Sequence, residues 1–176
     1  MNLIYRLVII SYNEGKFKAV IMVSLEAVKQ YFAKQGLADR IVVHDQVSDT
    51  VEHAATVIGC LPGQIAKTMA FQQKAGVVLV VMAGDYKINN QAYKAQFHQK
   101  ASMVPFTEVA TVVGHEPGGV CPFAINPGIS VYLDESLNQY ETVYPAAGSP
   151  DSTIELTVTE LAKYSQGTWV TVAKSM

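Results

Sequence analysis

The sequence predicts a single α+β domain, and three observations support this fold class. The chain has 176 residues, which fits one domain with a sizeable core. Hydrophobic residues make up 49% of it, which indicates a globular protein. Strand patterns cluster through short turns, helical patterns are spaced irregularly among them, and neither a repeat nor a linker divides the chain. This order favours α+β over a doubly wound parallel sheet.

The first elements are expected to be a helix and a short strand. Residues 24–35 are predicted to be helical, capped by Ser24 and ended by Gly36, with one apolar face made of Leu25, Val28 and Phe32. Residues 41–45 then have the pattern of a short strand.

A second helix and a hairpin follow. The helix is expected within residues 50–59, with Thr50 as its cap, Gly59 as its end, and Ala54, Ala55 and Ile58 facing inward. Residues 65–71 and 76–85 are β-branched or apolar and are separated by a polar turn. They predict a hairpin whose second strand is central and buried.

The remaining segments alternate between helices and strands. A polar, basic helix is expected over residues 87–100, with Ile88, Ala92, Ala95 and Phe97 facing inward. A short helix capped by Thr107 follows, with Glu108 favouring its N-terminal end. Strands are then expected over 129–137, 141–148 and 153–158, a helix over 159–165, and a last strand over 169–173.

The N-terminal residues 1–21 are expected to form an extension outside a domain that spans residues 22–176. They contain a short apolar run interrupted by Arg6, too short for a membrane span, and no small-residue cleavage site. The helical signal begins only after the second methionine, Met22.

The charge is distributed unevenly along the chain. The formal net charge is −2, which argues against a protein that coats nucleic acid in general and against a DNA-binding role. Residues 53–107, however, carry five lysines and one acid, Asp85. This region could meet a polyanion, or its lysines could simply keep it soluble.

The cysteines and histidines indicate neither disulfides nor a metal site. Cys60 and Cys121 lack CxxC spacing and follow no secretory signal, so free thiols in the cytoplasm are expected. The four histidines, His44, His53, His98 and His115, form no spaced pair typical of a metal site.

Lys67 lies within an apolar strand pattern, "IAKTMAF". Its aliphatic stem could pack at a sheet edge while the ammonium group reaches water. Alternatively, it is a fixed cation in a pocket, where it would hold a phosphate or a polarised carbonyl.

The segment "VGHEPGGVCPFAI", residues 113–125, has unusually many backbone-shaping residues. Gly118 and Gly119 can adopt angles closed to other residues, and Pro122 fixes the exit of the loop. Such a loop could direct several N–H groups toward one ester oxygen, or it could be a tight connection between a helix and a strand. Cys121 could be a nucleophile, but no base or cation is evident beside it in sequence, so a small buried thiol is favoured.

An ordered set of motifs resembles the YbaK/ProX-like family of aminoacyl-tRNA deacylases. The motifs are "IAKTMAF", "VVLVVMAGD", "VGHEPGGVCPFAI", "VYLDESL" and "TVYPAAGSPDSTIEL", and the resemblance runs from about Leu25 to Val172. It implies a mixed, strongly curved, barrel-like sheet flanked by helices. It also implies hydrolysis of the ester between a wrong amino acid and its tRNA, by a free-standing or synthetase-attached domain.

The resemblance assigns two sites. Lys67 with Thr68 matches the signature lysine, which is associated with the 3′ end of the tRNA. The loop Gly118, Gly119, Val120, Cys121 and Pro122 matches the family's G-x-x-x-P loop, whose backbone amides would hold the aminoacyl carbonyl. The family generally uses no metal, cofactor or protein nucleophile, so a water or a substrate group would attack the ester.

The chain departs from the cysteinyl-tRNA-editing branch of this family. Ala146, Ala147, Gly148 and Thr153 stand where that branch has a serine-glycine-glycine run and an aspartate. Gly148 and Ser149 are still expected to border the pocket, whose walls would include Val43, Val47, Met69, Val120 and Cys121. We expect a small aliphatic or hydroxylated amino acid as substrate.

The leading interpretation is therefore an enzyme that deacylates mischarged tRNA in trans, with aminoacyl-tRNA and a synthetase as expected partners. A binding module that keeps the pocket without turnover is the alternative. An esterase of small metabolites is a third, although no G-x-S-x-G pattern is present. Lys87, Lys94 and Lys100 are the expected RNA-binding residues.

Overall fold

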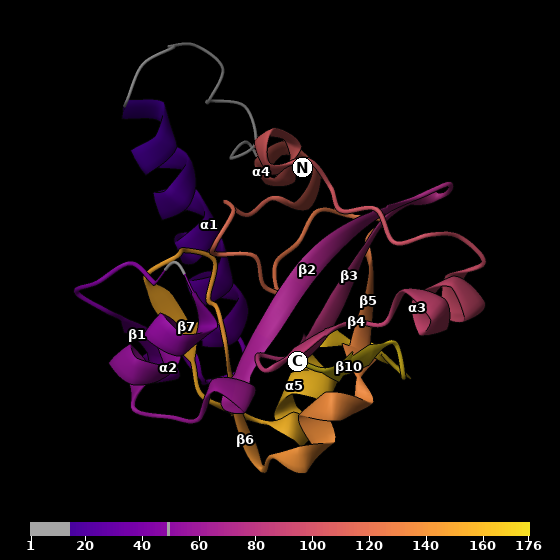
Figure 1. The fold of residues 1–176 in the computed structure, drawn as a ribbon. Helices are drawn as coiled ribbons and strands as arrows, with labels where there is room; N and C mark the ends of the chain where they lie inside the picture. The colour runs from indigo at the N-terminus through magenta and orange to yellow at the C-terminus, as the bar shows by residue number, and fades with distance from the viewer. Residues whose placement is uncertain (1–14, 49) are drawn as a thin grey trace.

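The computed structural model describes residues 15–48 and 50–176, with side chains described from Ser24 onward. Its centre is a curled six-stranded sheet in the order β8-β6-β2-β3-β5-β9 (Figure 1). The strands are β2 (Ile65–Gln73), β3 (Gly76–Ala83), β5 (Ser130–Asp134), β6 (Thr142–Pro145), β8 (Leu156–Thr157) and β9 (Thr168–Val170). The sheet is mixed because β2 is antiparallel to β3 and parallel to β6. The predicted α+β fold with a mixed, curved sheet is confirmed.

Two antiparallel ribbons accompany the sheet. One pairs β1 (Ile41–Val43) with β7 (Ser152–Ile154), and the other pairs β4 (Tyr86–Ile88) with β10 (Ala173–Ser175). The second ribbon corrects two predictions. The basic helix expected from residue 87 begins later, as α3 (Asn90–Phe97), because the side chain of Asn89 caps its first amides. The last predicted strand is in fact two strands, β9 and β10.

The other helices are α1 (Gly15–Ala33), α2 (Val51–Ile58), α4 (Phe106–Val113) and α5 (Val158–Ser165). Helix α2 has the predicted boundaries, because Thr50 accepts a hydrogen bond from the amide of His53 and Gly59 ends the helix with φ of 80°. Three short 3-10 segments also occur, Ala38–Arg40, Pro62–Gln64 and Glu135–Gln139.

Two predicted helix caps are wrong. Ser24 lies inside α1, and Thr107 lies inside α4, which begins at Phe106 because Pro105 precedes it as the cap residue. Most of the predicted extension, residues 1–14, lies outside the described residues, whereas the backbone of residues 15–21 belongs to α1. The extension stays a prediction.

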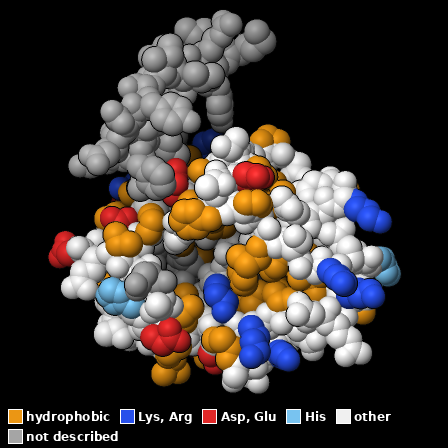
Figure 2. All heavy atoms as spheres, turned by 45° about the horizontal axis from the view of Figure 1, so that its top comes forward, with side chains coloured by type: hydrophobic (Ala, Val, Ile, Leu, Met, Phe, Trp, Pro, Cys, Tyr) orange, Lys and Arg blue, Asp and Glu red, His pale blue; other side chains and the backbone are white. Residues whose placement is uncertain are grey.

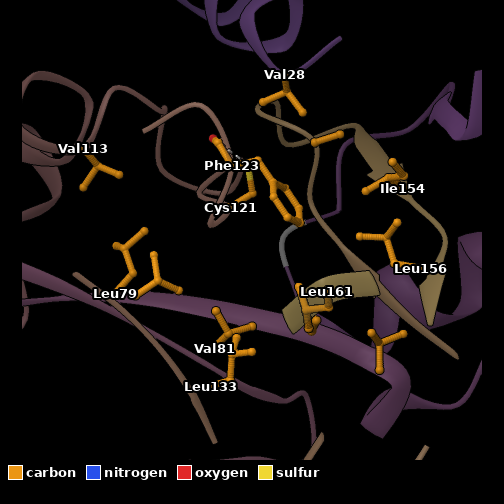
Figure 3. Close-up of a cluster of buried hydrophobic side chains, with 14 of the residues drawn as sticks. Val28, Leu79, Val81, Val113, Cys121, Phe123, Leu133, Ile154, Leu156 and Leu161 are labelled. Atoms are coloured by element: carbon orange, nitrogen blue, oxygen red, sulfur yellow. Dashed lines mark hydrogen bonds between the residues drawn. The ribbon is translucent and has the colours of Figure 1, made fainter. Parts of the chain in front are cut away.

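Strand β3 is buried on both faces, as predicted for a central strand. Leu79 and Val81 face a core that is covered by helices, part of which is drawn in Figure 3. Val80 and Met82 face a second core that includes Tyr93 of α3. Full burial of such side chains stabilises the fold by about 1.5–3 kcal/mol each.

The inward face of α3 differs from the prediction. Its fully buried side chain is Tyr93, whereas Ala95 is exposed and Ile88 lies in β4. The aromatic ring of Tyr93 packs against Phe71 of β2, which holds α3 against the sheet.

Candidate active site

A cleft of about 440 Å³ lies along β2. Its floor is formed by residues 65–70 of this strand. Its walls come from α2, from α4 and the segment before it, from the loop after α4, and from the region around β7. On the face drawn in Figure 2, hydrophobic side chains gather beside basic ones. The cleft brings Lys67 together with Gly118 and Val120, which are far away in the sequence.

Lys67 is a fixed cation in the floor of this cleft. Its Nζ donates hydrogen bonds to the carbonyl oxygens of Gly84, at 3.1 Å, and Tyr86, at 2.5 Å. An ammonium group has three N–H donors, so one remains for a ligand. Strand β2 lies between β6 and β3, and β6 pairs with Ile65 and Ala66, just before Lys67.

The charge state of Lys67 is set by opposing effects. Burial lowers the pKa of the Lys67 ammonium group, and the negative charges of Asp85 and Glu52 oppose this shift. The fixed position and the partial desolvation make the interaction of this cation with an anion stronger than in water.

Thr68 and Met69 also line the cleft. The hydroxyl oxygen of Thr68 is buried and has no hydrogen-bond partner among the described residues. Because an unpaired buried hydroxyl costs about 1–3 kcal/mol, this group is suited to pair with a ligand.

The glycine loop, residues 116–122, is held tightly in place. Gly118 has φ of 89°, a conformation that favours glycine. A Cβ atom on Gly119 would lie 2.6 Å from the Cα of Ser149, so no larger residue fits without movement of the backbone. The amide of Gly119 donates to the carbonyl oxygen of Glu116 at 2.9 Å. Within the described part of the chain, the amides of Gly118 and Val120 donate to no acceptor, and both residues line the cleft.

Cys121 faces the core rather than the cleft. It is fully buried beside Phe123, as Figure 3 shows. Burial raises the pKa of the Cys121 thiol to about 12, so it carries no charge at neutral pH. The next residue, Pro122, is also buried and has no N–H group to offer.

His115 cannot activate this thiol. Its Nε2 donates to the carbonyl oxygen of Phe123 at 2.7 Å, so its Nδ1 accepts from the hydroxyl of Ser24 at 2.5 Å. Burial also lowers the pKa of His115, which favours the neutral ring. Although the Cys121 sulfur lies 3.5 Å from Nε2, that nitrogen already carries a proton.

Several expected wall residues lie outside the cleft lining. Val43 and Val47 are 48% and 61% exposed, while Gly148 and Ser149 are buried beneath the glycine loop. None of these four residues contributes to the lining.

Other residues that sequence reasoning missed line the cleft instead. His44 follows β1, and its Nε2 lies 2.8 Å from the hydroxyl oxygen of Thr153 in β7. Both residues line the cleft, as do Met103, in the segment before α4, and Phe106, the first residue of α4. The alternation of β1 could have indicated that His44 points opposite to Val43, but no local signal predicts the pairing of β1 with β7.

The three expected RNA-binding lysines are all exposed and lie outside the cleft. Lys87 lies in β4, directly opposite Lys174 of β10, and Lys94 lies in α3. Lys100 follows α3.

The described residues contain no group of three or more histidine, cysteine, aspartate or glutamate side chains that could hold a metal ion. None of their helices is both long and apolar enough to cross a membrane.

Comparisons with known proteins identify the family. The model of the aminoacyl-tRNA editing domain matches residues 45–164. The protein YwhH of Bacillus subtilis is 41% identical over 153 residues, which cover 86% of this chain and 98% of YwhH. The proline–tRNA ligase of Bacillus licheniformis is 28% identical over 112 residues, which cover 62% of this chain and only 19% of the ligase.

A solved structure supports the same assignment of the fold. A proposed trans-editing enzyme for prolyl-tRNA synthetase superposes with a TM-score of 0.79 at 24% identity, covering 86% of this chain and 98% of that one. These matches confirm the YbaK/ProX-like resemblance, and the chain belongs to the aminoacyl-tRNA editing domain family.

Proposed function

We propose that this protein hydrolyses the ester bond of mischarged aminoacyl-tRNA that carries a small amino acid. The observation that carries the proposal is that Gly118 and Val120 line the same cleft as Lys67. Among the described residues, the amides of Gly118 and Val120 have no acceptor, and Lys67 keeps one donor for a ligand. Donors that are fixed before the substrate arrives are suited to an ester, because its carbonyl oxygen gains negative charge during hydrolysis.

In this proposal the amides of the glycine loop hold the carbonyl oxygen of the ester. Water adds to the carbonyl carbon, the carbon–oxygen bond to the ribose breaks, and the ribose hydroxyl regains a proton. The products are the free amino acid and uncharged tRNA. Each such donor typically contributes about 10²–10³ in rate. Lys67 would bind the phosphate or ribose end of the substrate, and no protein nucleophile is needed, which agrees with the buried, neutral Cys121.

The cleft and the relatives both support the proposed substrate class. Apolar side chains such as Val51, Ala54 and Met69 line much of the cleft and suit a small aliphatic side chain. Thr68 and the linked pair of His44 and Thr153 supply hydroxyl and imidazole groups that suit a small hydroxylated one. Because the ligase relatives act on proline tRNA, we propose that tRNA for proline, charged with a smaller amino acid, is the substrate.

The test is deacylation of a panel of mischarged tRNAs. The tRNA for proline and tRNAs for other amino acids would each carry alanine, serine, threonine or cysteine. A tRNA that carries a bulky aromatic amino acid would serve as the negative control. Wild type would be compared with Lys67→Ala and with Lys74→Ala, an exposed lysine in the turn after β2 that serves as the matched control. We expect selective hydrolysis that Lys67→Ala loses and Lys74→Ala keeps.

Two results would contradict the proposal. Equal hydrolysis of aromatic and small esters would refute the small-substrate assignment. Binding of tRNA without hydrolysis of any ester would favour the alternative, a binding module that presents tRNA to a synthetase.

A further inference from the structure

Phe106 is exposed at the mouth of the cleft. Its side chain is 71% exposed, and that of the neighbouring Met103 is 59% exposed, although both line the cleft. Phe106 is the only aromatic residue among the strongly exposed large hydrophobic side chains of the described chain. Leaving a phenylalanine in water forgoes about 1.5–3 kcal/mol of burial, so a partner that covers this ring would gain that stabilisation.

The backbone around Phe106 is held firmly. The amide of Val104 donates to the carbonyl oxygen of Ala70 at 3.0 Å, and Met103 forms an isolated bridge with Phe71. Val109 anchors α4 in the core. The backbone that carries the exposed ring is therefore held next to the end of β2, the same strand that carries Lys67. A ring on a held backbone has few angles left to order when it binds a flat partner.

The chemistry of the substrate indicates what this partner is. If an ester carbonyl lies at Gly118 and Val120, the ester oxygen belongs to the ribose of the 3′-terminal adenosine. The adenine base is attached to that same ribose, so it has to lie within one sugar's width of the ester. The exposed apolar surface of the same cleft is formed by Met103 and Phe106.

We propose that Phe106, flanked by Met103, is the platform on which the terminal adenine of tRNA stacks. This inference rests on the proposed ligand, aminoacyl-tRNA, but not on its hydrolysis. The small amino acid is a poorer occupant, because the open mouth encloses little of its surface. When a base stacks on an aromatic side chain, the flat face of the base makes the contact. Such stacking holds the nucleotide without hydrogen bonds to the edges of the base.

The experiment compares the affinities of two uncharged tRNAs, one with the complete CCA end and one that lacks the terminal adenosine. Wild type should bind the complete tRNA roughly 5- to 150-fold more tightly, the range that corresponds to one stacked base. Phe106→Ala and Phe106→Leu should lose most of this ratio, whereas Phe106→Trp should keep it. Thr107→Ala, an exposed neighbour outside the cleft lining, is the matched control and should behave as wild type.

The ratio is measured on one variant with two RNAs, so a general loss of stability cancels. An unchanged ratio in Phe106→Ala, or no preference in wild type, would overturn the inference. If Phe106→Ala kept the ratio but lost self-association or synthetase binding, the inference would also be overturned, and Phe106 would be assigned to a protein interface. A stacking ratio without hydrolysis of any ester would refute the deacylase and leave the platform intact.

Discussion

Replacing Gly119 by alanine tests whether the position of the glycine loop against the backbone of Ser149 controls catalysis. The added Cβ would lie 2.6 Å from the Cα of Ser149, 2.7 Å from its nitrogen and 2.8 Å from the carbonyl carbon of Gly148. These are backbone atoms that cannot rotate away. The loop would have to move by roughly 0.8 Å to reach an ordinary contact of 3.4 Å. Because a misplacement of about 1 Å can reduce a rate about 10²-fold, we expect a loss of this size in kcat.

The assay is deacylation of the best substrate of the panel, with kcat and KM measured separately. Overpacking should also lower the free energy of unfolding by about 1–3 kcal/mol, so thermal melting has to confirm that the variant is folded. Gly128→Ala is the control, because Gly128 has φ of 86° and open space around its Cα. It should be destabilised by backbone strain yet keep its activity. A folded Gly119→Ala variant with the kcat of wild type would refute the role of the loop.

Three further predictions concern single groups. Because burial lowers the pKa of Lys67, its positive charge is lost at a lower pH than that of an ordinary lysine, and kcat/KM should fall over that range. Lys67→Arg, which keeps its charge, should abolish this fall. A pH profile of Lys67→Arg that matches wild type would count against this role of Lys67. Cys121→Ala should keep kcat/KM within about threefold in a kinetic assay and lower the free energy of unfolding by about 1 kcal/mol in a denaturation experiment. A folded but inactive Cys121→Ala variant would support Cys121 as a nucleophile. Lys87→Gln and Lys174→Gln should each weaken tRNA binding and reduce the slope of log affinity against log salt concentration by about 0.7–0.9 per lost phosphate contact. Lys163→Gln is the control, because Lys163 lies over the ring of Tyr164 on another element. An unchanged slope in the first two variants would show that the RNA binds elsewhere.

Local signals predicted the elements that depend on neighbouring residues. Helix α2 has the predicted boundaries because Thr50 and Gly59 act within its own first and last turns. The hairpin of β2 and β3 could be predicted because a short polar turn joins two apolar runs. Ser24 was misassigned because a serine inside a helix looks the same in sequence as a cap, and its bond to distant His115 is invisible there.

Elements that depend on distant partners could not be predicted in this way. Lys87 and Ile88 of β4 are expected to be helical from local signals, since these do not reveal that β4, in the middle of the chain, pairs with β10 near its end. The same reason explains the lining of the cleft. Lys67 and Gly118 were identified through motifs, whereas His44 and Phe106 lie in the cleft only because β1, β7 and α4 pack around β2.

The contact of α1 with Gly148, which lies beneath the glycine loop, has a consequence for how the sequence can change. A Cβ on Gly148 would meet the carbonyl oxygen of Ser24 at 2.7 Å, while the hydroxyl of Ser24 is bonded to His115. Gly119 in turn rests on the backbone at Gly148 and Ser149. Five positions on three separate segments therefore share one small volume. A change at any one of them is tolerated only with compensation at another, so in related chains we expect these positions to vary together or not at all.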